Sequence, residues 1–227
     1  MSDSNGIRAE WERRFGRPEP KLICVGLNYF DHAGESGGEP PKAPLLFAKF
    51  ANTLCGDGDP IVLPPNVGHV DAEAELAVVI GTTARRVSEA DALEFVHGWT
   101  CANDVSARDY QFGDGQWFRG KSIDTFCPIG PRIVPRDELD PGDLQIQQRL
   151  NGEVLQDART SLLIFDVPTL VSYASQVITL EPGDLILTGT PSGVGVFREP
   201  KISLVPGDVV EIEIEGIGVL RNEVRAA

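Results

Sequence analysis

The chain has 227 residues, 41% of them hydrophobic, which is enough for one sizeable core and gives no clear sign of two. It carries 20 Lys and Arg against 34 Asp and Glu, a formal net charge of −14, so nucleic acids and anionic membrane surfaces are not expected partners. The first residues are polar, no apolar run approaches the roughly 20 residues of a membrane span, and the four cysteines form no CxxC or zinc pattern. We therefore expect a soluble, cytoplasmic protein without a disulfide framework, in which Cys24 and Cys101 are small buried residues.

The chain is predicted to begin with a polar arm that leads into a buried strand. Residues 1–20 are polar, and within them 7–16 (IRAEWERRFG) predict a short amphipathic helix with Trp11 and Phe15 on one face. The apolar run LICVGL that follows predicts a buried strand. We expect an N-terminal arm over 1–20 and a single domain over 21–227.

The next segment carries a candidate catalytic pair. His32 and Glu35 are three residues apart, so on one helical turn the carboxylate would orient the imidazole as a general base. The glycines and prolines around this pair are Gly34, Gly37, Gly38, Pro40 and Pro41. Such a composition suits a mobile segment that closes as a lid. On spacing alone, a solvated loop with an ordinary surface histidine is the stronger interpretation.

Two further strands are predicted over 44–50 (PLLFAKF) and 70–80 (VDAEAELAVVI). In the second run Asp71, Glu73 and Glu75 alternate, so on one continuous strand they would share a face opposite an apolar face. Three neighbouring carboxylates repel one another and require a compensating positive charge, from either a cation or basic side chains.

A metal site is one way to meet this requirement. Asp104 lies at another boundary between apolar and polar residues, and with Glu73 and Glu75 it would form an all-oxygen site suited to Mg²⁺ or Mn²⁺, with Ca²⁺ possible. The ExE spacing alone is more typical of a solvated strand face or a charged strand edge. The basic and amide side chains that follow Asp104 are Arg108, Gln111 and Lys121. Together with nearby aromatic residues, they indicate a pocket that holds a small anion on a metal.

A helix is predicted over 88–98 (SEADALEFVHG). Ser88 is its candidate N-cap, and Gly98 its C-terminal stop. His97 lies near the C-terminal end, where the helix dipole favours it, and is interpreted as structural. The segment PIGPRIV predicts the next strand.

The second half of the chain is rich in turns and strands. Asn151-Gly152 predicts a β-hairpin, and 166–177 predict a helix capped by Asp166. The loop TGTPSGVG lacks the GK[ST] ending of a phosphate loop. Its amides and the Thr190 hydroxyl would hold a substrate carboxylate, but a plain turn is equally compatible with the residues. A second ExE pattern, interpreted as the solvent face of an amphipathic strand, comprises Glu211, Glu213 and Glu215.

Helices and strands do not alternate regularly along the chain, which argues against a doubly wound sheet. We expect a strand-rich α+β fold with a few short helices.

Several blocks of the sequence resemble the fumarylacetoacetate hydrolase family. They are VGLNYFDHAGE, ELAVVIG, NDVSARDYQ, GKSIDTFCPIGP, LNGEVLQDART, LEPGDLILTGTPSGVG and GDVVEIEIEGIG, and they occur in the family's order over residues 20–225. The resemblance implies the family's mixed β fold, with a sheet and a barrel-like roll, and a homodimer. One departure is Phe50, which stands where the family usually has proline after the lysine.

The resemblance also assigns roles to the candidate residues. It implies that Mg²⁺ or Mn²⁺ is bound by Glu73, Glu75 and Asp104, with no organic cofactor. It favours the catalytic interpretation of the HxxE pair, since this looks like the dyad of the short family members, and the implied catalytic residues are His32, Glu35 and Lys121. The implied substrate-binding residues are Arg108, Gln111 and Thr190.

The implied substrate is a small 2-oxo or enol diacid whose enolate the metal stabilises. From the intact dyad we expect a hydrolase of the C–C bond in a 2,4-dioxo acid of the acylpyruvate or fumarylpyruvate type, with possible oxaloacetate decarboxylase activity. The alternatives are a 2-hydroxyhepta-2,4-diene-1,7-dioate isomerase or 5-oxopent-3-ene-1,2,5-tricarboxylate decarboxylase of aromatic catabolism, and a non-catalytic cation-dependent diacid-binding protein. In a further alternative the acids are structural and no metal binds.

Overall fold

The computed structural model describes residues 5–35, 37 and 39–227, and three sheets dominate this part of the chain. The first has seven strands in the spatial order β2 (Leu45–Lys49), β1 (Leu22–Gly26), β12 (Leu185–Leu187), β6 (Ala74–Ile80), β7 (Val96–Asn103), β9 (Cys127–Pro135) and β3 (Leu54–Cys55). The second has five strands in the order β11 (Glu153–Arg159), β10 (Gln145–Leu150), β13 (Val209–Ile214), β14 (Gly218–Ala226) and β4 (Ile61–Leu63). The third is the short pair β5 (Val70–Asp71) and β8 (Ser106–Ala107).

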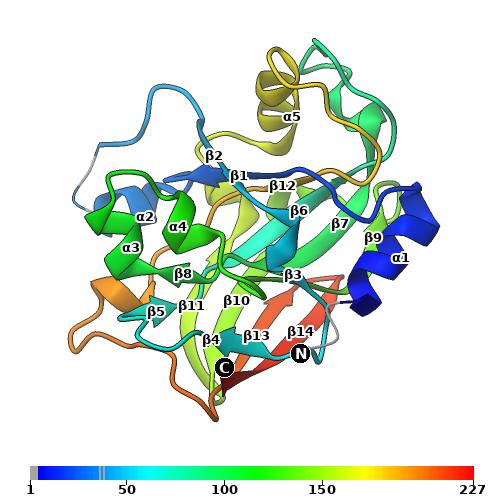
Figure 1. Cartoon of the computed structure of the whole chain (residues 1–227). Helices are drawn as coiled ribbons and strands as arrows, with labels where there is room; N and C mark the ends of the chain where they lie inside the picture. The colour runs from blue at the N-terminus through cyan, green and yellow to red at the C-terminus, as the bar shows by residue number, and fades with distance from the viewer. Residues whose placement is uncertain (1–4, 36, 38) are drawn as a thin grey trace.

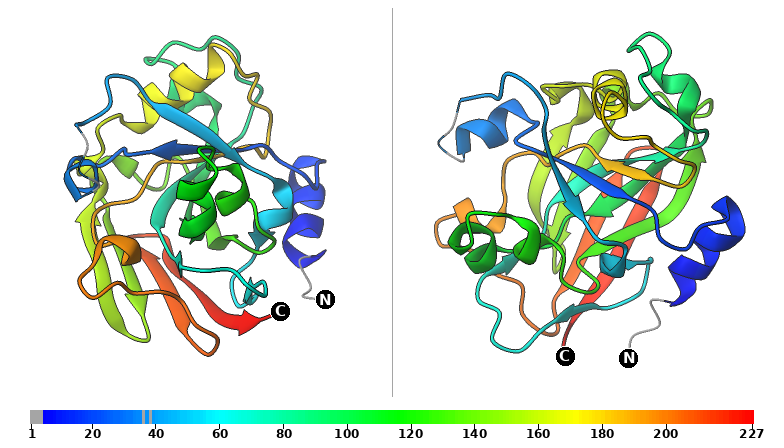
Figure 2. Two further views of the ribbon diagram at one scale, coloured as in Figure 1. Left: turned by 60° about the vertical axis from the view of Figure 1, so that its left-hand side comes forward. Right: turned by 45° about the horizontal axis from the view of Figure 1, so that its top comes forward.

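The helices are short and lie around the sheets (Figure 1). They are α1 (Asn5–Phe15), α2 (Phe30–Glu35), α3 (Arg108–Gly113), α4 (Phe118–Lys121) and α5 (Val167–Ser175). The 3₁₀ turns are η1 (Ala51–Thr53), η2 (Ala92–Phe95), η3 (Pro141–Asp143), η4 (Thr160–Leu162) and η5 (Gly195–Phe197). Figure 1 and the right-hand view of Figure 2 show α2, α3 and α4 on one side of the molecule and α1 on the opposite side. This is the strand-rich α+β fold with a curled sheet that the sequence predicted. Among the described residues, no helix has the length and apolar character needed to cross a membrane.

Strand β6 is the centre of the core, and all seven of its residues are buried. Its even-numbered residues, such as Leu76 and Val78, belong to the large cluster that also contains Ile212 of the five-stranded sheet. Its odd-numbered apolar residues, Ala77 and Val79, belong to a second cluster that contains Trp11 of α1. Successive side chains of a strand alternate between faces, so one apolar run serves both cores.

Several local predictions are confirmed. The strands β10 and β11 form the predicted hairpin, and the turn residues Asn151 (φ 52°) and Gly152 (φ 85°) adopt the left-handed conformation of a type I′ turn. Asp166 caps α5 through a hydrogen bond from the backbone N–H of Thr169 (3.0 Å). Trp11 and Phe15 pack on one face of α1, with ring centroids 5.3 Å apart. All four cysteines are buried and free, including Cys24 and Cys101, for which burial was expected.

The predicted helix over 88–98 is wrong. Only the 3₁₀ turn η2 forms, and β7 begins at Val96. Ser88 Oγ does accept a hydrogen bond from the N–H of Asp91 (3.3 Å), but it caps a turn rather than a helix. The apolar periodicity covers barely one turn here, and the β-forming residues that follow gain more by pairing with β6 and β9.

Two residues of that segment therefore lie in a different setting from the one predicted, although His97 keeps a packing role. Gly98 lies inside β7, where an added Cβ would come within 2.1 Å of the Val134 carbonyl oxygen, so it permits close approach to β9. His97 lies in a strand with its ring edge against Phe15, and burial and the nearby charge of Arg14 lower its pKa. No helix dipole stabilises its protonated form.

Candidate active site

The predicted strand 70–80 is interrupted, and the interruption builds the floor of a cavity. Strand β5 ends at Asp71 and β6 starts at Ala74. Between them, the N–H of Glu73 donates to Asn103 Oδ1 (3.1 Å), and the N–H of Ala74 donates to Gln156 Oε1 (2.9 Å). At this interruption, side-chain oxygens thus replace the backbone carbonyl acceptors of a regular strand pairing. The prediction of one continuous strand over 70–80 is therefore wrong, and Asp71 does not line the cavity, although Arg108 bonds to both Asp71 and Glu73.

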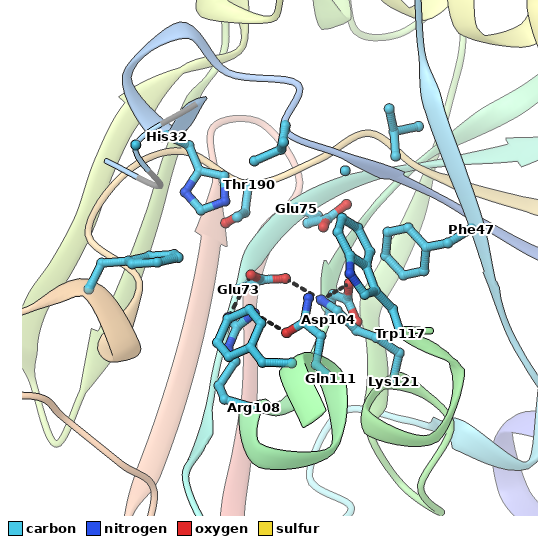
Figure 3. Close-up of a pocket in the computed structure, with 16 residues that line it drawn as sticks. His32, Phe47, Glu73, Glu75, Asp104, Arg108, Gln111, Trp117, Lys121 and Thr190 are labelled. Carbon is cyan, nitrogen blue, oxygen red and sulfur yellow. Dashed lines mark hydrogen bonds and ion pairs between the residues drawn. The ribbon is translucent and has the colours of Figure 1, made fainter. Parts of the chain in front are cut away.

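Glu73, Glu75 and Asp104 instead meet in a cavity of about 330 Å³. Their carboxylates are almost fully buried, and each offers an oxygen atom within 4.8 Å of those of the other two. Figure 3 shows these carboxylates between the α3–α4 side of the cavity and His32. The apolar walls are formed by Val25, Leu27, Phe47, Phe112, Trp117 and Phe197.

Basic side chains neutralise part of this cluster. Arg108 donates from Nε to Asp71 Oδ1, from Nη2 to Glu73 Oε1 and from Nη1 to Gln111 Oε1, each at 2.7 Å. Lys121 Nζ donates to Glu73 Oε2 and Asp104 Oδ2, both at 2.6 Å (Figure 3). Burial acts to raise the pKa of Glu73, but the charges of Arg108 and Lys121 outweigh it and hold this pKa well below the ordinary value.

Glu75 is in a different position, because it forms no ion pair with the basic side chains that the structure describes. Its Oε2 accepts a hydrogen bond from the N–H of Gly189 (2.7 Å). Burial, followed by repulsion from Asp104 and Glu73, raises the pKa of Glu75 well above the ordinary value. A cation beside this carboxylate would remove that penalty.

A count of the buried charges supports the same conclusion. The buried acids at and beside the cavity floor are Asp71, Glu73, Glu75 and Asp104, and the buried bases paired with them are Lys49, Arg108 and Lys121. Four negative charges against three positive charges leave one negative charge over. The donors are all oxygen, which is the set preferred by Mg²⁺ and Mn²⁺, so the residues present fit the predicted metal.

Lys49 is a member of this network that the sequence analysis missed. Its Nζ donates to Asp104 Oδ1 (2.5 Å) and to the carbonyl oxygen of Val105 (3.1 Å), and the residue is buried. The strand predicted over 44–50 is correct. The sequence also contained a signal for the buried charge, because a lysine inside an apolar run is buried only when it is paired. Its partner lies 55 residues further along the chain and has no local sequence signature.

His32 and Glu35 lie on α2 at the opposite side of the cavity. His32 Nδ1 is 3.2 Å from Glu35 Oε2, and Glu35 Oε1 accepts a hydrogen bond from the N–H of Gly193 (3.0 Å). The His32 ring packs against Phe197, with centroids 5.8 Å apart, and only 6% of the residue is exposed. The alternative of a solvated surface histidine is therefore wrong. Gly38 of the predicted lid lies outside the described residues, and closure of the lid stays a prediction.

Thr190 also faces the cavity, beside His32 (Figure 3). Its hydroxyl accepts a hydrogen bond from Gln156 Nε2 (2.8 Å), which leaves the hydroxyl proton available to a ligand. Of the nine predicted site residues, all except Glu35 line the cavity, and Glu35 is bonded to one that does. Residues from six separate segments of the chain thus converge at one place.

Comparison with known proteins identifies a family. The model of the fumarylacetoacetate (FAA) hydrolase C-terminal family matches residues 21–225. The chain is 48% identical over 210 residues to a mitochondrial oxaloacetate tautomerase of Rattus norvegicus, which covers 92% of this chain and 67% of the relative. It is 49% identical to a mitochondrial oxaloacetate tautomerase of Homo sapiens, with the same coverage. The chain thus spans about two thirds of the length of these relatives.

Solved structures give the same result for the fold. A 5-carboxymethyl-2-hydroxymuconate delta-isomerase from Mycobacterium smegmatis superposes with a TM-score of 0.83 at 49% identity, over 91% of this chain and 79% of that one. A 2-hydroxyhepta-2,4-diene-1,7-dioate isomerase from Mycobacterium marinum gives a TM-score of 0.81 at 48% identity, over 91% of this chain and 74% of that one.

Proposed function

The chain belongs to the fumarylacetoacetate hydrolase family, and from this premise we propose that it is a metal-dependent tautomerase or isomerase of a small 2-oxo or enol diacid. The observation that carries the proposal is the position of the His32–Glu35 pair across one cavity from the carboxylates of Glu73, Glu75 and Asp104. A base on one side and an anion-stabilising site on the other are what proton transfer next to a carbonyl group requires.

In the proposed reaction His32 moves the proton. Because its Nδ1 is bonded to Glu35, its Nε2 is the nitrogen that can take a proton from the carbon next to the 2-oxo group. The carboxylate of Glu35 then stabilises the imidazolium. The proton returns at another atom of the same conjugated system. Return at the oxygen converts the ketone into the enol, the reverse path converts an enol into the ketone, and return at a more distant carbon moves a double bond.

The remaining residues bind and neutralise the substrate. When bound to Glu73, Glu75 and Asp104, Mg²⁺ or Mn²⁺ supplies the positive charge that stabilises the enolate. Lys121 adds a buried positive charge at the same end of the cavity. Arg108, Gln111 and the Thr190 hydroxyl are assigned to the substrate carboxylate. The aromatic walls exclude water and match a planar conjugated substrate.

Hydrolysis of a C–C bond is the second candidate, because the same dyad could deprotonate a water molecule instead of the substrate. The sequence alone favoured this reaction. The relatives are named as tautomerases and isomerases of 2-oxo or hydroxy-diene diacids, and these names favour proton transfer without cleavage.

Other parts of the prediction stay proposals. These are the homodimer, the division into an arm over 1–20 and a catalytic domain over 21–227, the absence of an organic cofactor, and the cytoplasmic location. The relatives named above are mitochondrial, so location needs its own measurement.

A product assay separates the candidates. The protein would be incubated with enol oxaloacetate, acetylpyruvate, fumarylpyruvate and a 2-hydroxy-diene-dioate, in Mg²⁺ or in excess EDTA, and the products identified by NMR. Metal-dependent ketonisation or double-bond migration supports the proposal. Release of pyruvate from the dioxo acids would move the assignment to the hydrolase, and release of CO₂ from oxaloacetate would move it to a decarboxylase.

A further inference from the structure

We propose that the hydrogen bond between Asp31 and Ser192 positions the helix that carries His32 and Glu35, so that Asp31 and Ser192 are positioning residues for the proton transfer. This inference rests on the proposed function, since it concerns the alignment of the same dyad. Ser192 Oγ donates to Asp31 Oδ2 at 2.7 Å, although the two residues are 161 positions apart.

Asp31 makes a second contact that connects this bond directly to the catalytic histidine. Its other oxygen, Oδ1, accepts a hydrogen bond from the backbone N–H of His32 (2.8 Å). The carboxylate of Asp31 therefore bridges the loop at Ser192 and the backbone of the residue that moves the proton. A change in this bridge acts on His32 without removing any group of its side chain.

The neighbouring residue of the loop holds the other member of the dyad. The N–H of Gly193 donates to Glu35 Oε1 (3.0 Å). Gly193 has φ 102°, and an added Cβ would lie 2.1 Å from the Leu155 carbonyl oxygen, so the loop backbone is held tightly at this point. Helix α2 thus meets a fixed loop at two consecutive residues, one contact for each end of the helix.

Among the residues that the structure describes, few other contacts hold α2 in place. The helix has six residues, which is too short to be stable by itself. Phe30 is 58% exposed, and open space surrounds the position where Gly34 would carry a Cβ. The bonds to Ser192 and Gly193 and the packing of His32 on Phe197 therefore carry much of its orientation. Because reacting atoms must be placed within a fraction of an ångström, loss of one such bond should lower the rate without unfolding the protein.

The test compares Ser192→Ala, Asp31→Ala and the double variant with a matched control, Ser161→Ala. Ser161 Oγ donates to Asp143 Oδ1 at 2.7 Å, which is the same type of bond at the same length, at an exposed position in η4 away from the cavity. Ser192→Thr keeps a hydroxyl and serves as the conservative rescue. The first readout is independent of activity: the rate at which diethyl pyrocarbonate modifies His32, measured by peptide mass spectrometry and resolved from His69 and His97.

We expect Ser192→Ala to accelerate modification of His32 and to lower kcat by about 3- to 10-fold, the range that one hydrogen bond supports, with Mg²⁺ affinity unchanged. Asp31→Ala also removes the acceptor for the N–H of His32 and should have at least the same effect. The double variant should be no worse than Asp31→Ala, because without Asp31 the bond to Ser192 is already lost. Ser192→Thr should restore most of both properties, and Ser161→Ala should match the wild type. If Ser192→Ala behaves like Ser161→Ala in the modification assay, the inference is wrong.

The readouts also separate this inference from the proposed function. If the wild type converts none of the diacids, while Ser192→Ala still accelerates modification of His32 and Ser161→Ala does not, the positioning role stands and the tautomerase proposal fails. If the wild type is active and additive losses appear in the double variant, the two residues act independently, which overturns the shared bond.

Discussion

Glu75 differs from the other two carboxylates of the cluster, and this difference gives it a role of its own. Glu73 and Asp104 are each bonded to basic side chains, whereas the one hydrogen bond that Glu75 receives within the described part of the chain comes from the N–H of Gly189. Its charge is therefore the costly one in the metal-free protein. We interpret Glu75 as the carboxylate whose ionised form is stabilised mainly by the bound cation.

Glu75→Gln should stabilise the metal-free protein at neutral pH. The folded-state pKa of Glu75 is raised, so the stability associated with its neutral form is complete below the ordinary pKa of 4.5 and is lost as the pH rises through the folded-state pKa. Glutamine keeps the acceptor for Gly189 without the charge. In EDTA, the melting temperature of the variant should exceed that of the wild type by an amount that grows between about pH 5 and pH 8.

Addition of Mg²⁺ gives the control for this prediction. The ion should raise the melting temperature of the wild type, because it binds the folded state, and should have little effect on the variant. A variant that melts below the wild type in EDTA at neutral pH would show that Glu75 is not strained.

Lys49→Met should destabilise the protein, because the substitution removes one of two bases that neutralise buried Asp104. Loss of one partner of a buried ion pair typically costs about 3–5 kcal/mol, and the lower end is expected here because Lys121 remains. Urea unfolding measures the change, with Lys42→Met at an exposed position of the same segment as the control. A loss equal to that of the control would mean that Lys49 contributes nothing to the network.

At the scale of elements, what the sequence predicts depends on how local the determining interaction is. The hairpin at Asn151-Gly152 and helix α5 with its Asp166 cap are set by neighbouring residues, and both were predicted. The interruption at Glu73 was not, because it depends on acceptors from Asn103 and Gln156, which are distant in the chain.

The helix predicted over 88–98 was wrong for a related reason. Its local pattern favours a helix, but β7 pairs with both β6 and β9 in the sheet. No local feature of the sequence indicates this pairing. The same limit applies to the site. The sequence identified all nine candidate residues through recognisable motifs, whereas the partners that orient them, such as Lys49 and Gly193, were missed.

Gly98→Ala tests the strand interpretation. A Cβ at this position would meet the Val134 carbonyl oxygen at 2.1 Å, so β7 and β9 must separate locally. We expect a loss of about 1–3 kcal/mol in the free energy of unfolding, as for other overpacked positions. Gly6→Ala is the matched control, since open space surrounds Gly6 in α1 and alanine favours helices. Equal stability of the two variants would contradict the close approach of the strands.

At the scale of the whole molecule, the charge of the protein opposes the charge of its proposed substrate. The chain has a formal net charge of −14, and the four buried acids at and beside the cavity floor outnumber the three buried bases, so the attraction for a diacid depends on the bound cation. A diacid must therefore approach through a repulsive field and bind in an attractive site. The cavity with its cation has to outweigh the rest of the surface at short range.

This arrangement predicts an unusual salt dependence. Salt screens remote charges more than those in contact, with a Debye length of about 8–10 Å near physiological ionic strength. At saturating Mg²⁺, we expect kcat/KM for a dianionic substrate to rise as NaCl increases from about 0.01 to 0.15 M, and to rise less for a monoanionic 2-oxo acid. Steady-state kinetics at constant pH measure both. A fall in kcat/KM for the dianion would indicate that the local field of the cavity dominates the encounter.

The most direct test of the central claim is exchange of the protons on the carbon next to the 2-oxo group. Oxaloacetate in D₂O would be followed by proton NMR with wild-type protein and with His32→Gln, in Mg²⁺ and in EDTA, after subtraction of the protein-free rate with the same metal. We predict rapid exchange by the wild type in Mg²⁺, loss of that exchange in EDTA, and a decrease of at least about 100-fold in His32→Gln. Exchange that is unaffected by EDTA, or that persists in His32→Gln, would contradict the account of a dyad acting across the cavity from a metal-binding carboxylate cluster.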